Sequence, residues 1–234
     1  MTNEAILFDM DGVIASSEIQ KAEAHVQTVL DLGGTDSPAL RTLYGEIIGH
    51  SFERTSNRFL DCAGLPSTPD FQQAYLERYS AIYRSMIDKV QLTPGAKALL
   101  QALVSRPYRL GLVSSAHGDE VTALLRRHQI APFFTVVITR EDVTAHKPAP
   151  EPYLKALERL DLAQHPELAV VYEDTWAGIT AARAAGLTVF AVRHALNARQ
   201  DFSGAAGIFD SLADARILPT IEATFQHSRG IEPC

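Results

Sequence analysis

The sequence predicts an α/β protein with a doubly wound parallel sheet and an all-helical segment inserted after the first strand. Three observations support this fold class. Short, continuous apolar runs are typical of strands buried in a parallel sheet, and such runs occur at residues 5–7, 109–113, 134–138, 168–172 and 188–192. Helical apolar spacing fills the stretches between the later runs, whereas residues 15–92 carry helical spacing alone.

The first apolar run, Ala5-Ile6-Leu7, is followed by a helical region that we predict to be a separate cap domain, residues 15–92. Apolar residues recur there at intervals of three and four, as on one face of a helix. The stripes begin at Ile19, Leu40, Phe59 and Phe71, and glycine- or proline-containing breaks separate them at residues 33–34, 49 and 64–66. The region therefore predicts a small helical bundle.

From Thr93 onward, apolar runs alternate with helical patterns at residues 96–104, 120–128, 152–160 and 177–185. A further short strand and a helix are expected within residues 207–225. Alternating strands and helices with short connections imply a parallel sheet with right-handed crossovers. Residues 1–14 and 93–234 are therefore predicted to form one α/β core domain.

Composition narrows the classes of partner. The chain has 234 residues, a formal net charge of −7 and no basic cluster, which argues against a nucleic-acid partner. No apolar stretch approaches the roughly 18 residues needed to cross a bilayer, and the first residues lack a signal-peptide pattern. Two cysteines are too few for a disulfide framework. We expect a cytoplasmic protein that has no membrane partner. We also expect it to be a monomer.

Two carboxylates one residue apart, Asp9 and Asp11, follow the first predicted strand. Ligands of open α/β sheets bind outside the carboxyl ends of the strands. Two anions this close repel each other unless a cation or a shared proton neutralises them. The alternative is a turn in which the aspartates only cap backbone groups. The pair predicts a magnesium site that handles phosphate.

Three later connections offer matching groups at the same edge of the sheet. Ser114 and Ser115 follow the run at 109–113, where a hydroxyl can bind a phosphate oxygen or cap the next helix. Lys147 precedes Pro148, which stiffens its loop, although a lone lysine is more often only solvated. Glu173 and Asp174 follow the run at 168–172 and offer oxygens to Mg²⁺, or they favour the dipole of the next helix.

Together these elements resemble the signature motifs of the haloacid dehalogenase (HAD)-like hydrolase superfamily over nearly the whole chain. The subgroup with a helical C1 cap, which contains β-phosphoglucomutase-like and phosphoglycolate phosphatase-like enzymes, is the most similar. The matching segments are Asp9-Met10-Asp11-Gly12-Val13, Ser114, Lys147-Pro148 and Glu173-Asp174. The resemblance implies a Rossmann-like core, a Mg²⁺ cofactor and a small phosphorylated metabolite, such as a sugar phosphate, as substrate.

The resemblance also implies roles for individual residues. Asp9 would be the nucleophile that forms an aspartyl phosphate, and Asp11 the general acid and base. Ser114, Ser115 and Lys147 would bind the phosphoryl group. The metal would be held by Asp9, by Asp11 through its backbone carbonyl, and by Asp174 with Glu173 nearby. Because dehalogenases and phosphonoacetaldehyde hydrolases of this superfamily lack an aspartate at the position of Asp11, the chain is expected to cleave phosphate monoesters.

The cap departs from the pattern of the sugar-phosphate mutases. Lys21 stands where those enzymes carry a histidine, and Phe52 stands where they carry an arginine that clamps a second phosphate. Lys21, His50, Ser51 and Phe52 are our candidates for substrate discrimination. We therefore expect a phosphatase acting on a monophosphate whose remainder is neutral or apolar. A β-phosphoglucomutase-like mutase is the alternative within the family, and a non-catalytic phosphosugar-binding protein is the alternative outside enzymes.

Overall fold

The computed structural model describes residues 3–228, and the chain divides into two compact units. One unit contains residues 3–16 and 92–228, and the other is Ser17–Gln91. The strands β2 (Ala15–Ser16) and β3 (Gln91–Leu92) pair with each other where the chain changes unit. Among residues 3–228, no helix combines the length and the apolar character that crossing a bilayer requires.

The larger unit is built on a six-stranded sheet in which each pair of neighbouring strands is parallel. The strand order is β5-β4-β1-β6-β7-β8. The α/β fold class predicted from the apolar runs is confirmed. The strands are β1 (Ala5–Phe8), β4 (Arg109–Val113), β5 (Val136–Ile138), β6 (Ala169–Glu173), β7 (Thr188–Val192) and β8 (Gly207–Phe209).

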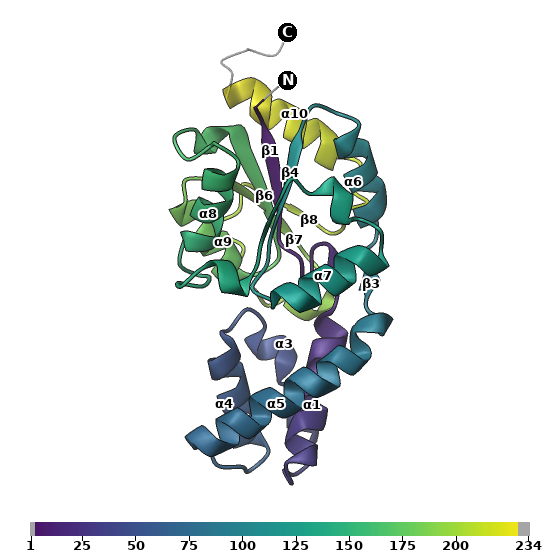
Figure 1. Ribbon diagram of the computed structural model, residues 1–234, viewed down its shortest axis with the longest axis vertical. Coiled ribbons are helices and arrows are strands. Elements are labelled where there is room, and N and C mark those ends of the chain that lie inside the picture. The colour runs from purple at the N-terminus through teal and green to yellow at the C-terminus, as the bar shows by residue number, and fades with distance from the viewer. Residues whose placement is uncertain (1–2, 229–234) are drawn as a thin grey trace. The chain divides into compact units, whose positions relative to one another are not determined.

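Helices cover both faces of this sheet (Figure 1). On one side lie α8 (Glu151–Arg159) and α9 (Trp176–Ala184), and on the other lie α6 (Ala96–Val104) and α7 (Gly118–Arg127). The last helix described, α10 (Ile217–Ser228), buries Ile217, Ile221 and Phe225. Short 3₁₀ turns complete the connections at η2 (Ala131–Phe133), η3 (Arg140–Asp142), η4 (Pro166–Leu168) and η5 (Ala195–Asn197).

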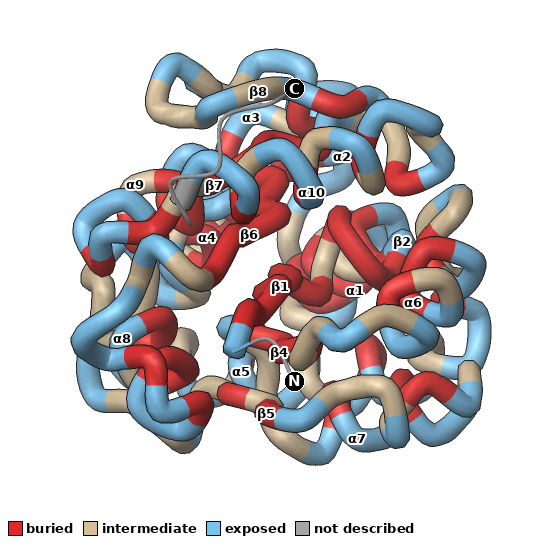
Figure 2. Tube along the Cα trace, turned by 90° about the horizontal axis from the view of Figure 1, so that it is seen from above, coloured by how far each residue is buried: buried red, intermediate tan, exposed pale blue. Residues whose placement is uncertain are grey.

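The strands are buried almost throughout, as Figure 2 shows for β1 and β6. The side chains of each strand alternate between the two faces of the sheet. Residues of neighbouring strands that are in register therefore form a layer on one face, and the residues next to them in sequence form a layer on the other. Phe8, Tyr172 and Phe190 are in register and stack with ring centroids 5.5 and 5.6 Å apart. On the opposite face, Leu7 and Val171 join the cluster that includes the apolar side of α8 and α9. Burial on both faces explains why the strands appear as continuous apolar runs.

The smaller unit is helical, as the periodicity of residues 15–92 predicts. The stripe of apolar residues at 40–48 is divided between two short helices, α2 and α3. The elements of the unit are α1 (Glu18–Asp31), α2 (Pro38–Thr42), α3 (Tyr44–Ile47), α4 (Phe52–Cys62), α5 (Pro69–Met86) and η1 (Ile87–Lys89).

A buried histidine occupies the centre of an aromatic cluster in this unit. The ring centroid of His25 lies 4.3 Å from that of Tyr79 and 4.8 Å from that of Phe59. Its Nδ1 accepts a hydrogen bond from the Tyr75 hydroxyl at 2.7 Å when the proton of the ring is on Nε2. Burial, and secondly the charge of Lys21, lower the pKa of His25 from about 6.5 to about 3. The histidine is therefore a neutral member of the core.

Candidate active site

The central strand β1 presents Asp9 at its carboxyl end. The backbone N–H of Asp9 donates to the carbonyl of Tyr172 at 3.0 Å, which continues the β1–β6 ladder by one residue. The chain then turns at Gly12, whose φ of 78° is unfavourable for residues with a Cβ. Asp9 is 7% exposed and Asp11 is partly exposed. Since β4, β1 and β6 are neighbours, the residues that follow them, Ser114, Asp9 and Asp174, belong to one edge of the sheet.

Lys147 reaches Asp9 from the connection that precedes α8. Its Nζ donates to Oδ1 of Asp9 at 2.6 Å, to Oε1 of Glu173 at 2.6 Å and to the backbone carbonyl of Val113 at 2.9 Å. The ammonium group also lies 5.1 Å from the ring centroid of Tyr153. The lysine side chain is only 6% exposed. Lys147 is thus fixed by three oxygens rather than solvated.

Glu173 is held by donors on both of its carboxylate oxygens. Oε1 accepts from Lys147 and from the hydroxyl of Tyr153 at 2.9 Å. Oε2 accepts from the backbone N–H of Asp174 at 2.9 Å and from the N–H and hydroxyl of Thr175 at 3.2 and 3.3 Å. Five donors therefore surround a carboxylate that is fully buried.

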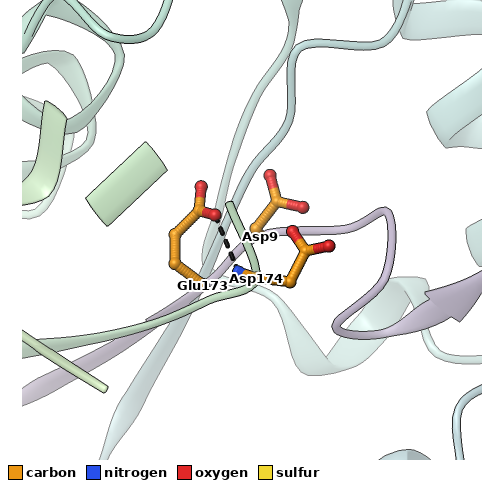
Figure 3. A group of neighbouring side chains, drawn as sticks. All are labelled: Asp9, Glu173 and Asp174. Atoms are coloured by element: carbon orange, nitrogen blue, oxygen red, sulfur yellow. Dashed lines mark hydrogen bonds between the residues drawn. The ribbon is translucent and has the colours of Figure 1, made fainter. Parts of the chain in front are cut away.

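Three acids come close enough to share one cation. Asp9, Glu173 and Asp174 each offer an oxygen, and these oxygens lie within 4.8 Å of one another. Figure 3 shows the three side chains grouped together, with the Glu173 carboxylate bonded back to the N–H of Asp174. All three are buried. Among residues 3–228, the carboxylate of Asp11 does not belong to this group, and the expected contribution of Asp11 to a metal site is its backbone carbonyl.

The cluster contains more negative than positive charge. Burial raises the pKa of Asp9 well above its usual value; Lys147 opposes this effect, while Glu173, Asp174 and Asp11 add to it. Burial also disfavours the charge on Lys147, but Asp9 and Glu173 outweigh it and raise the pKa of that lysine well above 10.5. Lys147 therefore stays protonated, and the acids favour a further positive charge. Carboxylate oxygens in this arrangement suit Mg²⁺, which prefers hard oxygen ligands.

Ser114 and Ser115 differ in their surroundings. Ser114 is 3% exposed, and its Oγ accepts a hydrogen bond from the N–H of Ala116 at 3.1 Å. Ser115 is exposed, and the interpretation of Ser115 as a helix cap is wrong, because His117 is the residue that precedes the first turn of α7. The carboxylate of Glu141 accepts from the N–H of Gly118 at 3.0 Å and lies 2.6 Å from His117 Nδ1. An anionic side chain thus already occupies part of this helix N-terminus.

The four residues proposed for substrate discrimination belong to the helical unit, and the structure places each of them there without testing that role. Lys21 lies 3.7 Å from the carboxylate of Glu18. Ser51 caps α4 by accepting from the N–H of Arg54 at 3.3 Å. Phe52 packs within the aromatic cluster, 5.2 Å from the ring centroid of Tyr79. Burial, followed by the charges of Arg54 and Arg58, lowers the pKa of His50.

Sequence reasoning missed several residues that complete the acidic site. Tyr153, on α8, bonds Glu173. Gly178 permits the Glu173 carboxylate to lie against α9, because a Cβ there would be 1.8 Å from Oε1. His194 Nε2 lies 2.9 Å from Oδ2 of Asp174, and Asn197 Nδ2 donates to the carbonyl of Asp174 at 2.9 Å. Since His194 and Asn197 follow β7, the position of that strand's carboxyl end was the signal that could have identified them.

A family model described as "Haloacid dehalogenase-like hydrolase" matches residues 6–192. The chain belongs to this family. The expectation of an enzyme of the haloacid dehalogenase-like hydrolase family, drawn from four separated motifs, is confirmed. The matched range includes each of the motif residues, from Asp9 to Asp174, and the whole helical unit.

Proteins similar to this chain include a phosphatase, a putative β-phosphoglucomutase and the protein CbbY. The chain is 30% identical over 196 residues to "Phosphorylated carbohydrates phosphatase" of Thermotoga maritima, covering 83% of this chain and 87% of the relative. The crystal structure of a putative β-phosphoglucomutase from Thermotoga maritima is 26% identical, with a TM-score of 0.73 and coverage of 94% and 99%. A mutant of CbbY from Rhodobacter sphaeroides, solved with xylulose 1,5-bisphosphate, is 26% identical, with a TM-score of 0.78 and coverage of 90% and 95%.

Proposed function

We propose that this protein is a Mg²⁺-dependent phosphatase that hydrolyses a small phosphate monoester, such as a sugar phosphate, through an aspartyl-phosphate intermediate. The observation that carries the proposal is the arrangement around Asp9. Its carboxylate lies 2.6 Å from the ammonium of Lys147 and within 4.8 Å of oxygens of Glu173 and Asp174. Three acids and a lysine therefore meet at one edge of the sheet, and this supports a nucleophile, a fixed positive charge and a metal ion acting together there.

In the first step, a carboxylate oxygen of Asp9 attacks phosphorus, and the bond from phosphorus to the ester oxygen breaks. Asp11 donates a proton to that leaving oxygen. In the second step, water attacks the aspartyl phosphate, Asp11 accepts the proton of the water, and the carboxylate of Asp9 is released with inorganic phosphate. Asp11, two residues from Asp9 and partly exposed, suits a group that must exchange protons with substrate and solvent.

Lys147 has two tasks in this scheme. It fixes the orientation of Asp9 through the bond to Oδ1, and its charge stabilises the oxygens of the phosphoryl group in transfer. Glu173 keeps the lysine in place, because it accepts from Lys147 and Tyr153 on the same oxygen. Ser114, at the end of the neighbouring strand β4, is the candidate hydroxyl for the phosphoryl group. We retain Ser115 as a second candidate.

The residues present suit a magnesium ion. Asp9 and Asp174 are the carboxylates that we propose hold it, together with the backbone carbonyl of Asp11. Glu173 lies within the same group of acids, but its five hydrogen-bond donors suit it better to bracing Lys147. When bound, the ion supplies positive charge next to the oxygens of the phosphoryl group. Burial first, and then the charges of Glu173, Asp174 and Asp11, raise the pKa of Asp9, and a bound cation would favour its ionised form.

The helical unit is proposed to act as a cap domain that selects the substrate, and the unit containing residues 3–16 and 92–228 as the catalytic core domain. Lys21, His50, Ser51 and Phe52 remain our candidates for discrimination. The packing of Phe52 against Tyr79, and the lack of an arginine at that position, favour a phosphatase over a mutase that must clamp a second phosphate. A cytoplasmic location, a monomeric state and the absence of a nucleic-acid partner stay predictions.

The proposal is tested with a panel of phosphorylated metabolites, measuring inorganic phosphate release with MgCl₂ and with EDTA. We expect release that requires Mg²⁺ and falls to background in Asp9→Asn. A protein that binds sugar phosphates but hydrolyses no member of the panel would contradict the enzymatic role.

The second candidate, a β-phosphoglucomutase-like activity, is favoured by the likeness to the Thermotoga maritima structure. It is tested by adding a sugar bisphosphate as activator and following isomerisation by NMR. Isomerisation faster than phosphate release would replace the phosphatase assignment with a mutase.

A further inference from the structure

One segment beyond β7 supplies three side chains to the loop that carries Asp174. His194 Nε2 lies 2.9 Å from Oδ2 of Asp174, and Asn197 Nδ2 donates to the carbonyl of the same residue at 2.9 Å. Oε1 of Gln200 accepts from the backbone N–H of Trp176 at 2.8 Å. The three residues are spaced by three in the sequence, and we call residues 194–200 the support segment.

The support segment is itself fixed by hydrogen bonds. Oδ1 of Asn197 accepts from the N–H of His194 at 2.7 Å, and Nδ2 of the same side chain donates to the carbonyl of Val192 at 2.9 Å. Asn197 is fully buried. The N–H of Gln200 donates to the carbonyl of Asn197 at 2.9 Å. The segment is therefore anchored to the end of β7 and presents its side chains in a defined order.

These bonds also assign the tautomer of His194. The backbone N–H of Leu196 donates to Nδ1 at 3.3 Å, so Nδ1 is the acceptor nitrogen of the ring. The proton is then on Nε2, which donates to Oδ2 of Asp174. Gly12 encloses this contact from the β1 side, because a Cβ at that position would lie 2.2 Å from Oδ2 and 2.8 Å from Nε2. One oxygen of Asp174 is thus committed to His194 in a confined space.

From this arrangement we infer that His194, supported by Asn197 and Gln200, is a positioning residue that makes Asp174 a one-oxygen ligand and so favours Mg²⁺ over Ca²⁺. The inference rests on the proposed role of Asp174 as a metal ligand. Mg²⁺ needs near-ideal octahedral geometry, whereas Ca²⁺ accepts more oxygens and often takes both from one carboxylate. A donor held on Oδ2 therefore opposes the binding mode that Ca²⁺ prefers. Partners of this kind orient metal ligands, and removing them weakens metal binding about 10- to 100-fold.

The test is isothermal titration of the full chain with MgCl₂ and, separately, with CaCl₂. In His194→Ala we expect the dissociation constant for Mg²⁺ to rise about 10- to 100-fold. The dissociation constant for Ca²⁺ should change much less, so the ratio of the Ca²⁺ constant to the Mg²⁺ constant becomes smaller than in the wild type. His194→Gln keeps an N–H donor and should recover most of the preference. As the matched control, His165→Ala removes an exposed histidine that lies 3.1 Å from Glu167, and should leave both constants unchanged.

A second variant protects the test against misfolding of His194→Ala. Gln200→Ala loosens the support segment at its far end, and Trp176, the one tryptophan of the chain, reports the change by fluorescence. We expect a weaker Mg²⁺-induced fluorescence change at a given Mg²⁺ concentration than in the wild type. Equal changes in the Mg²⁺ and Ca²⁺ constants of folded His194→Ala, or no rescue by His194→Gln, would overturn the inference.

Failure of the inference can be separated from failure of the proposed function. If folded His194→Ala binds both ions as the wild type does, while phosphate release still requires Mg²⁺ and Asp174, the role of His194 is refuted and the phosphatase assignment stands. If Asp174→Asn binds Mg²⁺ with unchanged affinity, Asp174 is not a ligand, and both the metal site and the inference are refuted.

Discussion

Because His25 is buried as a neutral ring, we expect the protein to lose stability in mild acid, where the unfolded chain binds a proton at this histidine and the folded protein does not. Burial, with Lys21 as the second cause, lowers the pKa of His25 to about 3 in the folded protein, against about 6.5 when unfolded. The unfolded chain therefore binds a proton first as the pH falls. The stabilisation is present above pH 6.5 and is lost progressively from about pH 6.5 toward pH 3. Between pH 7 and pH 5 this linkage lowers the free energy of unfolding by about 2 kcal/mol.

The measurement is urea unfolding, followed by circular dichroism at pH 7 and pH 5. The double variant His25→Phe/Tyr75→Phe removes the titrating ring and the hydroxyl that would otherwise lose its partner. We expect its loss of stability between the two pH values to be about 2 kcal/mol smaller than that of the wild type. Tyr75→Phe alone is the matched control and should keep the wild-type difference, because burial is the main cause of the shift. Equal pH dependence in the double variant and the wild type would refute this reasoning.

Three further predictions concern the α/β unit. Gly178→Ala would place a Cβ 1.8 Å from Oε1 of Glu173; we expect a lower melting temperature and loss of phosphate release, and a variant with wild-type values would contradict the packing described. Tyr172→Phe removes a buried hydroxyl that has no hydrogen bond among the residues described, so urea unfolding should show a gain of about 1 kcal/mol, and a loss would count against an unpartnered hydroxyl. Lys147→Met leaves Asp9 and Glu173 without the ammonium group that both contact. We expect phosphate release to fall by about 10²-fold or more and the free energy of unfolding to fall by about 3–5 kcal/mol. Retained activity would exclude the lysine from catalysis.

The sequence was sufficient to predict the parallel sheet because its strands are buried on both faces. The aligned aromatic layer of Phe8, Tyr172 and Phe190 and the opposite layer containing Leu7 both required apolar residues, which produced runs without alternation. Element ends were less predictable. Helix α7 begins at Gly118, earlier than the predicted 120, because Glu141, which is distant in the sequence, accepts from its first N–H.

The acidic cluster could be anticipated because its residues follow neighbouring strands. Asp9 comes directly after β1, Asp174 directly after β6, and the two strands are paired. The surroundings of these residues could not be anticipated in the same way. Gly178 resembles other small residues of α9 in the sequence, yet its role is set by the position of the Glu173 carboxylate in space. His194 follows β7, which could indicate its edge of the sheet, but its contact with Asp174 depends on the conformation of the connection after β7, which no periodic pattern encodes.

The central claim is that Asp9 becomes phosphorylated during turnover. The most direct measurement is rapid acid quenching of the enzyme with a phosphomonoester substrate and MgCl₂, followed by mass spectrometry of the peptide that contains Asp9. We predict a phosphoryl group on Asp9 that is absent in Asp9→Asn. In Asp11→Asn it should accumulate with p-nitrophenyl phosphate, whose leaving group needs no proton from Asp11, because the base that activates water is lost. Phosphate release at the wild-type rate by Asp9→Asn, or a phosphoryl group found on another residue, would contradict the account.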